Sequence, residues 1–218
     1  MELIRHIQSH LETVYNIHTG EAAVDYLIGA GEVSELLQVK DVSGLPRELF
    51  LVNPNPQDDT LEIALFFHDT LKENLKLNSP LKNLNGENVS DFCTLIEGVS
   101  HFVYYLHKMG LEHNVSQLEM ELQAEVDKFV LLSLFCQAQG QERTRLMELL
   151  FEDYCLHQEL SSEQITRYET ATEFAKKFCY RLTQNSANQE IKPFLDEARI
   201  FYSLPQEEKI RMITGSHV

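Results

Sequence analysis

The chain has 218 residues, of which 43% are hydrophobic and 24% charged, a composition typical of globular protein rather than of a disordered chain. Its 34 acidic residues outnumber 18 basic ones and give a net charge of −16, which argues against nucleic-acid binding, since that function needs a basic surface. No apolar stretch approaches the roughly 20 residues that a membrane-spanning helix needs, so we expect no membrane partner either.

The cysteines indicate a compartment. They are widely spaced, form no CxxC motif and lie at Cys93, Cys136, Cys155 and Cys179. Such cysteines are typical of small buried side chains in a reducing environment. The N-terminal stretch is amphipathic and lacks the apolar core of a signal peptide. We therefore expect a cytoplasmic protein.

The first unit, residues 1–88, mixes helical and strand patterns and is predicted to be a small α+β unit. Two apolar runs, 48–53 and 61–68, flank the turn-forming sequence PNPQDDT, which predicts a β-hairpin at about 48–68. The sequence LLQVKDV, at 36–42, is compatible with a third strand.

The second unit, residues 89–218, is helical throughout and is predicted to be an up-down antiparallel bundle. Glycines and capping sequences separate four main helices: the first stops at Gly110, the second runs from Ser116 to about Gly140, the third follows, and the fourth begins at Ser161. The connections are short, which makes consecutive helices antiparallel. Two short helices follow at the C-terminus. The fold class is α+β, predominantly α.

Polar side chains interrupt the apolar stripes of three bundle helices. In the second helix Glu125 stands where an apolar residue is expected, and Glu121 lies one turn earlier at the edge of the stripe. Asp153 and His157 take two consecutive stripe positions of the third helix, and Tyr168 takes one in the fourth. At about 1.5 Å per residue, counting from the turns puts them at similar heights. We therefore predict one polar layer inside the bundle.

Neighbouring polar residues have simpler interpretations. Glu119 fits a capping box at the start of the second helix, and Asp127 points away from the apolar stripe. Glu97 and His101 lie one turn apart, opposite the apolar stripe of the first helix, as is typical of a solvated face. The alternative for that face is a partner surface, because two aromatic residues lie beside it, Tyr104 and Tyr105.

Three interpretations of the predicted layer remain open. It could be a hydrogen-bonded network that fixes the helix register, or the wall of a cleft facing the N-terminal unit or a partner. It could also be a functional site. Glu121, Glu125, Asp153 and His157 could then hold one divalent metal ion. As catalytic residues, Glu125, Asp153, His157 and Tyr168 could perform acid/base chemistry, since paired carboxylates raise one pKa.

No motif identifies a reaction: P-loop, GxGxxG, HExxH and GxSxG patterns are absent. The single Asp-x-x-x-His spacing also differs from the paired Glu-x-x-His motifs of di-iron bundles. Our first hypothesis is a soluble, acidic, intracellular protein without a cofactor that works as a protein-binding or regulatory module, its partner another protein or a second copy of the chain. The alternative is a metal-dependent or acid/base enzyme that uses the polar layer and one divalent ion.

Overall fold

The computed structural model describes residues 2–39, 45–55, 60–141, 145–152, 161–185 and 191–215. The fold is α+β and predominantly α, as predicted. Its helices and strands are α1 (Glu2–Tyr15), η1 (Ala23–Tyr26), α2 (Ala30–Leu37), β1 (Glu48–Asn55), β2 (Thr60–Phe67), α3 (Asp69–Leu77), α4 (Val89–Gly110), α5 (Gln117–Ala138), α6 (Leu146–Phe151), α7 (Ser162–Asn185), α8 (Ile191–Ser203) and α9 (Gln206–Thr214).

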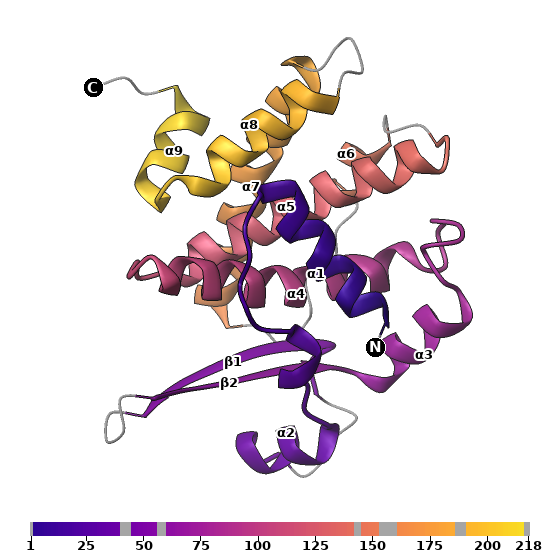
Figure 1. Cartoon of the computed structure of the whole chain (residues 1–218), viewed down its shortest axis with the longest axis vertical. Coiled ribbons are helices and arrows are strands. Elements are labelled where there is room, and N and C mark those ends of the chain that lie inside the picture. The colour runs from indigo at the N-terminus through magenta and orange to yellow at the C-terminus, as the bar shows by residue number, and fades with distance from the viewer. Residues whose placement is uncertain are drawn as a thin grey trace.

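The predicted hairpin is present. Strands β1 and β2 pair antiparallel, with Glu48 opposite Phe67. Side chains alternate between the two faces of the hairpin. Phe66 therefore packs with Val33 of α2 on one face, whereas Leu65 and Phe67 enter the main core on the other. Figure 1 shows the hairpin and α2 at one end of the molecule, and α8 and α9 at the other.

The prediction of a third strand at 36–42 is wrong for the part of this segment that the structure describes. Leu36 and Leu37 form the last turn of α2, and the helix ends at Gln38, whose φ of 55° is left-handed. The rest of that predicted strand, from residue 40, lies outside the described residues. A short apolar run can belong to a helix or a strand, and here the preceding AGEVSE sequence extends into it as a helix.

The helix starts follow the capping chemistry of the sequence. The Ser116 hydroxyl accepts a hydrogen bond from the Glu119 amide at 3.0 Å. Ser161 and Gln164 form a complete capping box, with reciprocal bonds of 2.9 Å and 3.3 Å. Of the predicted third bundle helix, the structure describes only the part in α6.

Helix α5 lies at the centre of the molecule. It packs between α4 and α7, and α1 contacts it as well as α4 and α8 (Figure 1). Every residue from Glu121 to Ser133 is consequently buried except Glu125, which is half-buried. The single apolar stripe assumed from the sequence is therefore wrong for α5, because a helix surrounded by other helices has no solvated face.

One apolar core joins most of the elements. It includes Ile7 of α1, Phe102 of α4, Phe129 of α5 and Phe201 of α8, as well as the inner face of the hairpin. The division into two units at residue 88 stays a prediction. Among the described residues, no helix has the combination of length and apolar character that crossing a membrane requires.

Candidate functional site

A row of polar residues on α4 faces a similar row on α5. Residues three or four apart lie on the same side of a helix, so each row follows from sequence spacing alone. The six residues, which we call the α4–α5 seam, are Cys93, Glu97 and His101 on α4 and Glu121, Glu125 and Lys128 on α5. The helices run antiparallel, so His101 meets Glu121 at one end of the seam and Glu97 meets Lys128 further along it.

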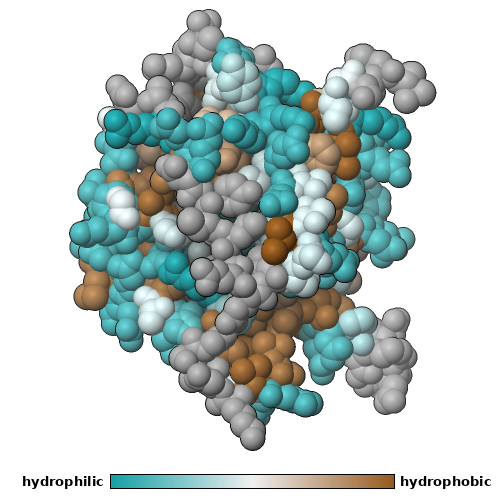
Figure 2. All heavy atoms as spheres, turned by 180° about the vertical axis from the view of Figure 1, so that it is seen from behind, coloured by the Kyte–Doolittle hydropathy of each residue, from teal (hydrophilic) through white to brown (hydrophobic). Residues whose placement is uncertain are grey.

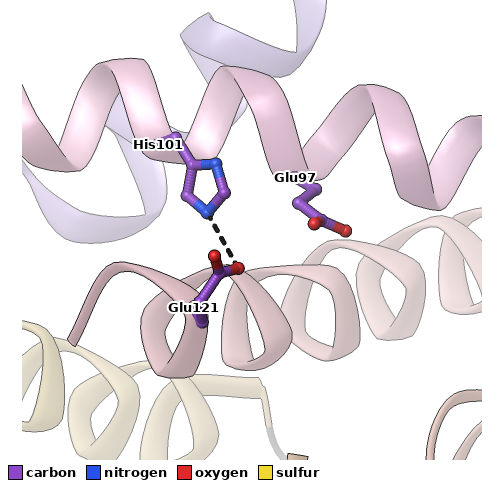
Figure 3. Close-up of side chains that lie close together, drawn as sticks. All are labelled: Glu97, His101 and Glu121. Carbon is purple, nitrogen blue, oxygen red and sulfur yellow. Dashed lines mark ion pairs between the residues drawn. The ribbon is translucent and has the colours of Figure 1, made fainter. Parts of the chain in front are cut away.

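His101 lies between two carboxylates. Its Nδ1 is 3.8 Å from Glu48 Oε1 and its Nε2 is 3.4 Å from Glu121 Oε2, the pair drawn in Figure 3. The side chain is only 7% exposed. Burial by itself would lower the pKa of His101, but the charges of Glu121 and Glu48 raise it well above its ordinary value. The two carboxylates therefore favour the protonated form of the imidazole.

Glu48 reaches His101 from the first residue of β1, and Gly98 makes this approach possible. A Cβ atom at position 98 would lie 2.8 Å from Glu48 Cγ and 2.7 Å from Phe67 Cε1, closer than carbon atoms can pack. Burial raises the pKa of Glu48, although His101 opposes the shift. Within the described part of the chain, Glu48 Oε1 and His101 Nε2 are buried without a hydrogen-bond partner.

Lys128 occupies the other end of the seam. Its Nζ lies 3.1 Å from Glu97 Oε2 and 2.6 Å from Glu125 Oε1. Burial would lower the pKa of Lys128, but Glu125 and Glu97 raise it well above its ordinary value, so the ammonium is charged. Burial also raises the pKa of the nearby Cys93 thiol to about 12, which excludes a thiolate nucleophile there at neutral pH.

The structure brings some of the predicted layer together. Glu121 and Glu125 lie in the seam, and Tyr168 of α7 lies close enough to Glu121 to feel its charge. Burial, with the nearby charge of Glu121, raises the pKa of the Tyr168 phenol. Asp153 and His157 lie outside the described residues, so their place in the layer stays a prediction, as does a catalytic or metal-binding role for any of the five.

The interpretation of one face of α4 as solvated is wrong. His101 is buried, and the Glu97 side chain is only 22% exposed. Tyr104 is fully buried and cannot contribute to a partner surface, whereas Tyr105 is half-buried, so a partner surface on this face stays a prediction. Both pairs with i,i+4 spacing, Glu97–His101 and Glu121–Glu125, are visible in the sequence. The first pair was predicted to be exposed because only one face of α4 was assumed to be buried.

A second polar network lies on the opposite side of α5. Asp127 accepts hydrogen bonds from Tyr15, from Ser100 at 2.5 Å and from Gln123 at 2.7 Å. The Lys209 ammonium donates to Gln123 at 2.7 Å and to the Tyr104 hydroxyl at 2.6 Å. Burial raises the pKa of Asp127 to about 6 and lowers that of Lys209 to about 7.

This network corrects two predictions about α5. Asp127 does not point to solvent but is 1% exposed. Glu119 does supply its backbone amide to the Ser116 cap, but its side chain accepts a 2.5 Å hydrogen bond from Tyr104 instead of reaching back to the cap. Both carboxylates are buried because α5 is covered on this side by α1 and α9 residues.

The seam has the donor set of a metal site. Glu97, His101 and Glu121 each offer one ligand atom, and these atoms lie within 4.8 Å of one another (Figure 3). Carboxylate oxygen and imidazole nitrogen suit Mn, Fe and Zn ions. An ion about 2.1 Å from each ligand needs ligand atoms about 3 Å apart, so the three side chains would have to move closer together to bind one.

Comparisons with protein-family models, with curated proteins and with solved structures gave no match to this chain. The chemistry of the two buried networks is therefore the basis for a function. In the Asp127 network the carboxylate is satisfied by three donors. Around the seam, in contrast, four glutamates face one lysine and one histidine, and the imidazole Nε2 lacks a hydrogen bond. An excess of buried negative charge favours a bound cation.

Proposed function

We propose that this chain is a metal-dependent enzyme whose divalent ion is bound by Glu97, His101 and Glu121. The observation that carries the proposal is the convergence of these three ligand atoms within 4.8 Å in a buried, carboxylate-rich seam. A cation there would replace the proton on His101 and reduce the repulsion among the glutamates. The proposal keeps the metal-site hypothesis drawn from the sequence but moves it from the third helix to α4.

Surrounding residues would support the ion. Glu48 faces His101 Nδ1, which leaves Nε2 directed toward Glu121, the carboxylate–histidine arrangement common around protein-bound metals. Tyr168 of α7 lies near the Glu121 carboxylate and would border the ion on that side. Three protein ligands leave coordination positions open, and Glu97 is partly accessible from solvent. The bound ion would supply Lewis acidity, which suits polarisation of a carbonyl or phosphoryl oxygen and metal-assisted hydrolysis.

The test is elemental analysis of protein purified without chelator. We expect stoichiometric Mn, Fe or Zn in the wild type, and its loss from the variant His101→Ala because the only nitrogen ligand is removed. The matched control is His107→Ala, since His107 is on the same helix but half-buried away from the seam, against the Tyr202 ring. A wild type that contains no metal, and whose melting temperature does not respond to added Mn²⁺ or Zn²⁺, would contradict the proposal.

A second candidate function is self-association, which is supported by apolar side chains on the surface. Leu36 and Leu37 at the end of α2 are 62% and 42% exposed. Figure 2 shows hydrophobic residues gathered at the same end of the molecule, where Figure 1 places α2 and the hairpin. Large apolar patches on a protein surface often mark interaction sites. We propose a second copy of this chain as the partner, since apolar faces pair without complementary charge.

We also propose a cytoplasmic location. No disulfide joins the described cysteines, Cys93, Cys136 and Cys179, as expected in a reducing compartment. Titration of the unfolded protein with a thiol reagent, after purification without reductant, should recover all cysteines as thiols. Recovery of disulfides instead would count against this location.

A further inference from the structure

Lys128 is a buried cation that directly contacts one of the candidate metal ligands. Lys128 is 8% exposed, and its ammonium lies between Glu97 Oε2, at 3.1 Å, and Glu125 Oε1, at 2.6 Å. Glu97 is therefore shared, because it contacts the ammonium and also belongs to the ligand group with His101 and Glu121. A glutamate shared between two cations, with further carboxylates on either side, is the arrangement expected of a site for two metal ions.

In proteins that bind two metal ions together, the ions lie about 3.5–4 Å apart and share ligands. The seam is long enough for two cations, since its rows extend over two helical turns from Cys93 to His101. One of the two positions is filled by the chain itself. We propose that the Lys128 ammonium takes the place of a second metal ion, so that the seam binds one ion and not two. This inference rests on the proposed function, because it presumes that the first ion binds.

The chemistry at the two ends of the seam explains why one end would bind a metal ion and the other holds the Lys128 ammonium. Lysine is a compact point charge with three N–H donors, so it can neutralise two carboxylates at once. It satisfies Glu125 and one oxygen of Glu97, and those groups can then no longer coordinate a free cation. The other end of the seam has Glu121 and the imidazole of His101, and together with Glu97, which the two cations share, they form the part left for an ion. A fixed positive charge beside that ion would also disfavour a second one.

Removal of the ammonium should therefore create a second ion site. In the variant Lys128→Met, the carboxylates of Glu97 and Glu125 become available, and Cys93, one turn before Glu97, adds a possible third donor. We expect equilibrium dialysis with Mn²⁺ to give one ion per chain for the wild type and two for Lys128→Met. Electron paramagnetic resonance should show magnetic coupling between two Mn²⁺ ions in the variant only.

Two control variants should keep the stoichiometry of the wild type. Lys128→Arg retains a cation in the seam. Lys177→Met removes a lysine that makes a similar 2.6 Å pair with Glu173, but on the exposed face of α7. A single ion in both the wild type and Lys128→Met would overturn the role of Lys128 while leaving the proposed function intact. A wild type that binds two ions would also overturn it, and a wild type that binds none would contradict the proposed function itself.

Loss of a buried lysine can prevent folding, and the experiment covers this case. If Lys128→Met is unfolded without metal, Mn²⁺ should restore a cooperative thermal transition, because the second ion replaces the lost charge. Circular dichroism at increasing Mn²⁺ concentration measures this. A variant that stays unfolded at Mn²⁺ concentrations that saturate the wild type would show that an ion cannot take the place of the ammonium, and would overturn the inference.

Discussion

Lys209 is a fully buried lysine whose ammonium donates to a phenol and an amide rather than to a carboxylate, among the residues that the structure describes. Its ammonium donates to Tyr104 and Gln123 and lies 4.3 Å and 5.1 Å from the ring centres of Tyr104 and Phe201. These neutral partners replace water incompletely, which is why burial lowers the pKa of Lys209 to about 7. The residue thereby fixes α9 to the centre of the molecule and makes the folded state sensitive to pH.

The pH dependence has a definite sign. Between pH 7 and 10.5 the unfolded chain holds a proton on Lys209 that the folded protein has released, so the free energy of unfolding should rise with pH. In Lys209→Met this contribution is absent. The difference in unfolding free energy between wild type and variant, from urea titrations across this range, should grow by about 5 kcal/mol in favour of the wild type, at about 1.4 kcal/mol for each unit of the pKa shift. Parallel pH profiles would show that Lys209 titrates equally in both states.

The chain offers a control for this pH effect at a lower range. Burial raises the pKa of Asp127 to about 6 from 3.8. Its stabilising contribution is therefore present below pH 3.8 and is lost as the pH rises through about 6, the opposite direction to Lys209. Because the two ranges do not overlap, a difference between the Lys209→Met and wild-type profiles above pH 7 identifies the lysine as the titrating group. Below pH 7 the variant should differ through Asp127, whose pKa the Lys209 charge lowers.

At the scale of elements, the contact between the hairpin and α4 depends on one glycine. Gly98 lies in the middle of α4, where glycine weakens a helix by roughly 1 kcal/mol relative to alanine. Its use there is explained by packing, since Phe67 and Glu48 both approach the position of the missing Cβ. The same close approach places the Glu48 carboxylate beside His101. The glycine therefore weakens α4, but it allows the close approach that places Glu48 beside His101 in the candidate site.

We expect Gly98→Ala to destabilise the protein by about 1–3 kcal/mol, as overpacked cores do, because the buried Phe67 ring has little freedom to move. The matched control is Gly110→Ala at the end of the same helix, where a Cβ would meet no atom within 4 Å, and it should be neutral or slightly stabilising. Urea unfolding of both variants measures the difference. Equal stabilities would mean that the hairpin shifts freely on α4.

Sequence patterns predicted where helices and strands lie better than they predicted which side chains are buried. Helix starts at Ser116 and Ser161 and the hairpin follow from local chemistry, and the polar stripe positions of Glu121, Glu125 and Tyr168 pointed to a cluster. His101 was missed because a helix contacted on several sides has no single polar face. Glu48 could not be assigned at all, since its place beside His101 depends on how the hairpin docks onto α4, which no local pattern encodes.

For the whole molecule, the net charge of −16 opposes contact between two copies, whereas the exposed Leu36 and Leu37 favour it. Salt changes this balance in one direction. The screening length is about 10 Å at 0.1 M salt and about 3 Å at 1 M, so repulsion between acidic copies weakens as salt is added. Apolar contacts do not weaken under the same conditions.

Self-association should therefore increase with salt. Light scattering coupled to gel filtration should give a larger mass at about 1 M NaCl than at about 0.1 M, and Leu36→Glu should stay monomeric at both. Leu77→Glu is the control, because Leu77 is 83% exposed but lies at the end of α3 rather than α2. A monomer under all conditions would exclude a second copy as the partner.

The two polar networks on opposite sides of α5 also hold this helix in one orientation about its axis. Glu121, Glu125 and Lys128 engage α4 on one side, while Glu119, Gln123 and Asp127 engage residues from α1, α4 and α9 on the other. With 3.6 residues per turn, a one-residue insertion would rotate everything after it by about 100°. The contacts on both sides therefore fix the rotational position of α5 about its own axis. A rotation that changed the contacts of one network would break those of the other.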